Sequence, residues 1–365
     1  MKYVDEFRHP EKVQHWVDAI DKIAVRPWTI MEVCGGQTHA IVKFGLHQLL
    51  PPSIRLIHGP GCPVCVTPLE MIDHALEIAA RKEVIFCSFG DMLRVPGSST
   101  DLLTLRARGS DVRMIHSPLE ALEIAAQNPR RQVVFFGVGF ETTAPPNAMA
   151  IFQARQRSLC NFSVLCSHVL VPPALSFLGL AEGCQVQGFL AAGHVCTVSG
   201  YAQYHPLAKQ LKMPIVITGF EPLDILQGLY FCIELLERNE CAVLNQYERA
   251  VHEIGNMAAQ HIVDEIFEVV DCNWRGIGMI AKSGLGIKKA YADLDAAARF
   301  PKHTKTALVD TGCWSGLILQ GKKKPHDCPL FGKEFTRETP MGAPMVSTEG
   351  ACSAYYAPLR FPTRS

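Results

Sequence analysis

Three cysteines in glycine-rich turns are the residues best suited to soft-metal or thiol chemistry. Cys34 ends an apolar run and is followed by Gly35 and Gly36, whereas Cys62 and Cys65 form a CxxC motif after His-Gly-Pro-Gly. The CxxC spacing serves dithiol–disulfide exchange and soft-metal binding alike, so by itself it does not discriminate between them. A second CxxC, which a closed structural zinc site would need, is absent from the sequence.

The segment 29–41, TIMEVCGGQTHAI, predicts a strand that ends at Cys34 and a helix that begins near Gln37. Glycines at such a bend let backbone N–H groups approach a ligand, and a helix N-terminus favours an anion. The same positive end is expected to lower the pKa of Cys34 and favour the thiolate. Thr38 and His39 add hydrogen-bonding side chains nearby. The alternative interpretation is a tight turn with an inert thiol.

Polar loops follow several other apolar runs. GFETTAP (139–145) contains Glu141, and GHV contains His194. Comparable loops hold Asp91, Arg94, Glu221 and Asp224. Helix capping explains each of these side chains when it is taken alone. If these side chains gather at one edge, where the predicted strands end, they would supply hydrogen-bond donors, a proton relay or a docking surface.

Composition restricts the class of protein. Of 365 residues, 48% are hydrophobic and 19% are charged, and the formal net charge is zero, so nothing favours nucleic acid as a partner. The charged N-terminus lacks a secretory signal, and no apolar run reaches the roughly 18 residues of a membrane span. We therefore expect a cytoplasmic location. In that compartment the 14 cysteines are not expected to form a disulfide framework.

Short apolar runs alternate with amphipathic helical stretches, which predicts an α/β protein with parallel sheets covered on both faces. The runs are 29–33, 54–58, 83–89, 112–116, 132–138, 162–168, 188–192 and 214–220. Similar strand–turn–loop patterns recur, so we expect two Rossmann-like domains, at 28–117 and 118–228. Residues 229–365, with the N-terminal helix 1–27, are expected to form a third domain, helical first and then loop-rich.

Nearly end to end, the chain resembles the HypD family of hydrogenase maturation proteins. The resemblance rests on motifs that occur in one order: CGGQTH, GPGCPVC, FGD with RVPG, GFETTAP, GHV and GFEPLDILQG. The resemblance implies a scaffold for the Fe(CN)2CO unit of nickel–iron hydrogenases. It also implies that the protein acts together with a HypC-type chaperone, a HypE-type cyanide donor and the hydrogenase large subunit. Carried over to this chain, Cys34 is the iron ligand, and Cys62 and Cys65 are a redox dithiol beside it.

The resemblance further implies a C-terminal [4Fe–4S] cluster on four cysteines. Cys328 and Cys352 match two of the family's positions, and Cys313 is the third candidate. Phe335 stands where one cysteine is expected, and Ser315 stands near another. With three thiols, His326 or a partner's group would have to complete the cluster; the alternative is a loop domain held by packing alone.

Two further functions remain open from the sequence. One is a thiol oxidoreductase whose CxxC acts without bound iron. The other is a paralogue without a cluster that only binds partner proteins. In the assembly function, Glu141, Cys62 and Cys65 are the candidate reactive residues, and Gly35, Gly36, Thr38, His39 and His194 are candidates for holding the iron unit's ligands.

Overall fold

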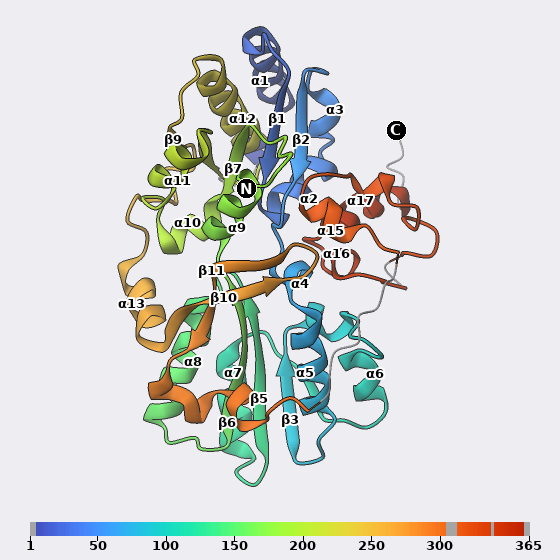
Figure 1. Ribbon diagram of the computed structural model, residues 1–365, viewed down its shortest axis with the longest axis vertical. Coiled ribbons are helices and arrows are strands. Elements are labelled where there is room, and N and C mark those ends of the chain that lie inside the picture. The colour runs from blue at the N-terminus through green and yellow to red at the C-terminus, as the bar shows by residue number, and fades with distance from the viewer. Residues whose placement is uncertain (1–4, 304–311, 337–338, 361–365) are drawn as a thin grey trace.

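Two sheets, one above the other along the long axis of the molecule, carry the fold (Figure 1). The computed structural model describes residues 5–303, 312–336 and 339–360. The first sheet has the strand order β2-β1-β7-β8-β9, and all its neighbouring pairs are parallel. Its strands are β1 (Trp28–Glu32), β2 (Ile54–His58), β7 (Gly188–Ala192), β8 (Ile215–Thr218) and β9 (Val243–Asn245).

The second sheet has the order β10-β11-β6-β5-β3-β4. Its parallel part is extended by an antiparallel hairpin, β10–β11, that pairs with β6. The strands are β3 (Val84–Ser88), β4 (Val112–Met114), β5 (Gln132–Gly139), β6 (Phe162–Val169), β10 (Phe267–Trp274) and β11 (Gly278–Ile287). Side chains at or just beyond the carboxyl ends of strands of both sheets, including Val33, Phe140 and Trp274, share one buried cluster. The carboxyl ends of β1 and β5 therefore meet between the two sheets.

Helices cover the faces of both sheets because their apolar sides need burial. In the first 160 residues they are α1 (Pro10–Ile23), α2 (Gly35–Lys43), α3 (Leu46–Leu49), α4 (Pro63–Val66), α5 (Leu69–Ala79), α6 (Leu102–Ala107), α7 (Pro118–Gln127) and α8 (Ala144–Gln156), with 3-10 turns at Asp5–Phe7 and Gly90–Arg94. Several begin at side-chain caps. Asp101 accepts the N–H of Thr104 and so starts α6 at a defined residue.

The later helices complete both layers and form a separate group at the C-terminus. They are α9 (Val171–Gly179), α10 (Gly193–Ser199), α11 (Tyr204–Leu211), α12 (Pro222–Glu237), α13 (Met257–Ile266), α14 (Ala296–Arg299), α15 (Ser315–Leu319), α16 (Ala343–Val346) and α17 (Ala351–Arg360), with 3-10 turns at Lys289–Leu294 and Pro325–Asp327. The group α15–α17 lies beside α2 (Figure 1). Among the helices in the described ranges, none combines the length and apolar character that a membrane span needs.

The predicted fold class is confirmed, and each of the eight predicted apolar runs contains a strand. The sheets, however, do not follow the predicted boundary at 117. Strands β1 and β2 pair with β7 in one sheet, whereas β3 and β4 pair with β5 in the other. The strands β9, β10 and β11 were not predicted. Apolar runs mark where strands form, but they do not encode which strands become neighbours.

Candidate functional site

The two cysteine motifs lie side by side, at the carboxyl ends of neighbouring strands. Strands β1 and β2 are paired in register, with Glu32 opposite His58, so the turns that follow them meet. The N–H of Gly35 donates to the carbonyl oxygen of Gly61 at 2.8 Å. A Cβ atom on Gly61 would lie 2.5 Å from the backbone nitrogen of Cys34. Only glycine admits this approach, which explains its place in the GPGCPVC turn.

The Cys34 thiol faces a histidine and an aromatic ring. Its Sγ lies 3.5 Å from Nδ1 of His194, at the start of α10. The ring of His194 packs against Phe220, with 5.3 Å between ring centroids. Burial lowers the pKa of His194 to about 4, so its imidazole is neutral at pH 7. A neutral imidazole beside a thiol is a pair of donors suited to a soft or borderline metal such as iron.

The expected lowering of the Cys34 pKa is wrong. The side chain is buried, and this desolvation raises the pKa of the thiol well above its usual value. The backbone N–H groups of Gln37 and Gly36 act in the lowering direction, as a helix N-terminus should, whereas Glu32 and Glu349 add to the rise. Burial outweighs the helix terminus here. Cys34 is therefore a protonated thiol that must lose its proton when it binds a metal.

A buried carboxylate holds the Cys34 turn in place. Glu32 is fully buried, and its Oε2 accepts the N–H of Cys34 at 2.8 Å. Its Oε1 accepts the hydroxyl of Thr38 and lies 2.5 Å from Nδ1 of His58. Nε2 of His58 lies 2.9 Å from the hydroxyl of Tyr355 on α17. Since a carboxylate only accepts, His58 carries its proton on Nδ1, and the chain links the Cys34 turn to the C-terminal helices.

The sequence analysis missed this support, although one signal was available. Glu32 interrupts an apolar strand, and a charged residue buried in a strand needs partners. Gln37 was also missed as a positioning residue: its Nε2 donates to Thr218 Oγ1 at 2.6 Å and fixes the first turn of α2 against β8. Phe220 had no recognisable signal, because it reaches the site from the end of a different strand.

Cys62 and Cys65 are both thiols and both are buried. The N–H of Cys65 donates to Sγ of Cys62 at 3.3 Å, within the first turn of α4. Burial raises the pKa of Cys65 well above its usual value, and the neighbouring Cys62 and Cys352 add to the rise. Cys352 of the C-terminal group is therefore near enough to the pair to influence its protonation.

We expect the site thiols to alkylate slowly. Because burial and a raised pKa keep Cys34 and Cys65 protonated and shielded near neutral pH, iodoacetamide at pH 8 should first modify the exposed Cys160 and Cys241. Mass spectrometry of peptides taken over a time course measures the order. Modification of Cys34 before Cys160 would contradict this account of the site.

The other predicted residues divide into two groups. His194 lies at Cys34, and Gly36 lies close enough that a Cβ atom there would be 3.6 Å from Cys34 Sγ. Thr38 instead donates to Glu32, and the His39 side chain is exposed. Glu141 lines a separate cavity that none of Cys34, Cys62 and Cys65 lines.

Two of the polar-loop residues have structural partners. Glu221 pairs with Arg8, and Asp224 pairs with Arg249 at 2.6 Å and takes part in the capping box of α12. Their positions after β8 are thus explained by ion pairing and helix capping.

The three C-terminal cysteines are brought together. Cys313 and Cys328 both raise the pKa of Cys352, after burial, which is the largest cause. A Cβ atom on Gly342 would lie 3.5 Å from Cys313 Sγ, 3.6 Å from Ser315 Oγ and 3.7 Å from the ring of Phe335. Ser315 and Phe335 therefore stand beside the thiols, as their sequence positions suggested.

This donor set does not fit a cluster bound by four cysteines. Phe335 is 0% exposed and fills the volume next to the thiols with an apolar ring. The His326 ring is packed between Phe331 and Tyr355. In the described ranges, no group of three or more His, Cys, Asp or Glu side chains is arranged to hold a metal ion.

Comparison with known proteins agrees with the motifs. The family model HypD, described as the hydrogenase formation hypA family, matches residues 11–358. The hydrogenase expression/formation protein HupD of Azotobacter chroococcum is 47% identical over 366 residues, covering 98% of this chain and 97% of the relative. The hydrogenase maturation factor HypD of Escherichia coli is 46% identical, and the alignment covers 98% of this chain and 98% of that relative. The hydrogenase maturation factor HypD of Azotobacter vinelandii is 47% identical, with 98% of this chain and 97% of that relative covered. The chain belongs to the HypD family.

Proposed function

We propose that this protein acts in hydrogenase maturation as a scaffold on which the Fe(CN)2CO unit is assembled, with Cys34 as the ligand of the cargo iron. Membership of the family and relatives named as hydrogenase maturation factors support the role in maturation. The observation that carries the assignment to Cys34 is its place: a thiol 3.5 Å from a neutral imidazole, at the N-terminus of α2.

The chemistry of the cargo matches the groups around Cys34. Iron that carries cyanide and carbon monoxide is bound well by a soft thiolate, and its cyanide nitrogens accept hydrogen bonds. The backbone N–H groups of Gly36 and Gln37 act on the Cys34 sulfur and so are donors next to the proposed iron ligand. Binding of the metal releases the thiol proton, because the thiolate is the ligand.

Cys62 and Cys65 supply a dithiol next to the iron site. Oxidation of the two thiols to a disulfide releases two electrons and two protons, which suits a reductive step during attachment of the diatomic ligands.

The implied partners are a HypC-type chaperone, a HypE-type cyanide donor and the large subunit of a hydrogenase. A direct test is to purify the chain anaerobically from cells that express these partners. We expect the chain to elute with the HypC-type chaperone and with iron that shows cyanide and carbon monoxide stretching bands. If the chain elutes with its partners but without iron, the partner-binding paralogue is the better interpretation.

We propose further that the C-terminal thiols hold no [4Fe–4S] cluster, because Phe335 occupies the place of the fourth thiol. Anaerobic reconstitution with iron and sulfide, followed by chemical counting, is expected to leave far fewer than the about four irons and four sulfides of a [4Fe–4S] cluster. Phe335→Cys should raise both counts, and Phe331→Cys is the matched control. Full counts in the unchanged chain would contradict the proposal.

A further inference from the structure

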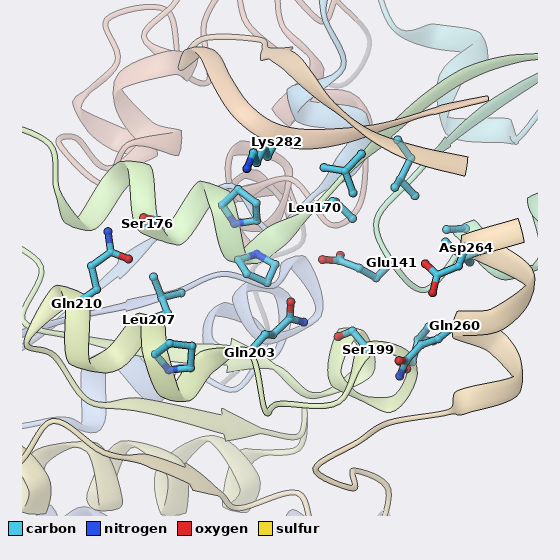
Figure 2. Close-up of a pocket in the computed structure, with 18 residues that line it drawn as sticks. Glu141, Leu170, Ser176, Ser199, Gln203, Leu207, Gln210, Gln260, Asp264 and Lys282 are labelled. Atoms are coloured by element: carbon cyan, nitrogen blue, oxygen red, sulfur yellow. The ribbon is translucent and has the colours of Figure 1, made fainter. Parts of the chain in front are cut away.

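A cavity of about 550 Å³ lies between helices α9, α10, α11 and α13 and the strand β11, away from the three site cysteines (Figure 2). Much of its wall is apolar. The rigid and aliphatic side chains that form it include Leu170, Pro172, Pro173, Pro206, Leu207 and Leu285. In Figure 2 the carboxyl of Glu141 points into this space from the loop after β5.

Glu141 is a buried carboxyl with half of its hydrogen-bonding capacity unused. Its side chain is only 8% exposed. One oxygen, Oε1, accepts the N–H of Val171 at 2.8 Å. The other, Oε2, has no hydrogen-bond partner in the described part of the chain. A carboxylate oxygen that is removed from water without a hydrogen-bond partner costs free energy. A ligand that donates a hydrogen bond to Oε2 would recover part of that free energy.

A cation with N–H groups would provide the hydrogen-bond partner that Oε2 lacks. Within the described ranges, no Lys, Arg or His forms an ion pair with Glu141. Lys282 and Asp264 also line the cavity, but Lys282 forms no ion pair with Glu141 in the described ranges, so the Glu141 carboxyl group faces a largely apolar space without a paired cation. Burial raises the pKa of Glu141 to about 7, and the approach of a cation would favour its ionised form.

We propose that this cavity binds a small organic cation, in which an ammonium or guanidinium group donates to Glu141 Oε2 and an apolar body packs against the proline and leucine wall. The site does not depend on the iron-assembly function, since none of its lining residues is Cys34, Cys62 or Cys65. It adds a ligand site for a different chemical class of molecule to the same protein.

Benzylammonium and benzyl alcohol provide a matched pair of probes, because they share an apolar ring and differ in charge. Isothermal titration of the full chain at pH 8, where Glu141 is mostly ionised, compares them. We expect benzylammonium to bind at least about tenfold more tightly than benzyl alcohol, as a charge-assisted hydrogen bond should provide. Equal affinities, or no binding of benzylammonium at millimolar concentration, would overturn the proposal without any variant.

A variant then assigns the binding to Glu141. Glu141→Gln keeps the shape but removes the charge, and it is expected to weaken benzylammonium binding by about tenfold or more. The same change at Glu182, which is exposed and lines a different cavity, serves as the control and should leave the affinity unchanged. Unchanged binding in Glu141→Gln would show that the cation binds elsewhere and would overturn the proposal.

Discussion

Cells whose only HypD-family protein carries Cys34→Ala are expected to lack active nickel–iron hydrogenase. The change removes the one sulfur at the N-terminus of α2 and leaves His194 without a neighbouring thiol. An imidazole alone does not supply the soft anionic ligand that the cargo iron requires. Hydrogenase activity in extracts, measured in a strain deleted for its own HypD-family gene and complemented with each variant, shows the effect.

The control for this experiment is Cys87→Ala. Cys87 is as deeply buried as Cys34 but lies on β3, in the other sheet, with no polar group of the site around it. Loss of a single sulfur from a packed interior costs both variants a similar amount of stability. We expect Cys87→Ala to retain most of the hydrogenase activity. Activity in the Cys34 variant equal to that of the Cys87 variant would refute the role of Cys34.

Glu32→Ala is expected to destabilise the protein by about 3 kcal/mol or more. The carboxylate receives hydrogen bonds from the backbone of Cys34, from Thr38 and from His58, and all of these donors are buried. Each donor left without an acceptor costs about 1–3 kcal/mol. Urea unfolding followed by intrinsic fluorescence measures the change in the first transition. The iron site should be lost as well, because the Cys34 turn is no longer held.

Two further variants show whether the hydrogen bonds cause this effect. Glu32→Gln keeps one oxygen acceptor and should cost less than Glu32→Ala. Glu83→Ala removes an exposed carboxylate with one weak ion pair at 4.0 Å, and such surface changes usually stay within about 0.5 kcal/mol. If Glu32→Ala unfolds at the same urea concentration as Glu83→Ala, the buried network does not support the site.

The strands could be predicted because a parallel strand buried on both faces is a continuous apolar run, as 132–138 illustrates. The distribution of the strands between two sheets could not be predicted, since β1 pairs with β7, which lies more than a hundred residues later in the chain. The hairpin β10–β11 escaped prediction for another reason. Its first strand is largely exposed and lacks a continuous apolar pattern.

Within the site, residue type and glycine-rich turns singled out Cys34 and the CxxC motif, and the pairing of β1 with β2 brings them together. The pKa of Cys34 was predicted in the wrong direction, since burial of the thiol outweighs the helix N-terminus and Glu349, which the fold brings from far along the chain, adds to the rise. The network around Glu32 depends in the same way on Tyr355. Local spacing predicts which groups can react, whereas their protonation depends on distant packing.

Infrared spectroscopy of the protein purified anaerobically with its partners tests the central claim most directly. The stretching bands of iron-bound cyanide and carbon monoxide lie in a spectral window free of protein absorption. We predict that wild-type protein and Cys87→Ala show these bands and that Cys34→Ala, purified with the same partners, lacks both the bands and the iron. Bands of equal intensity in Cys34→Ala would contradict the assignment of Cys34 as the ligand of the cargo iron.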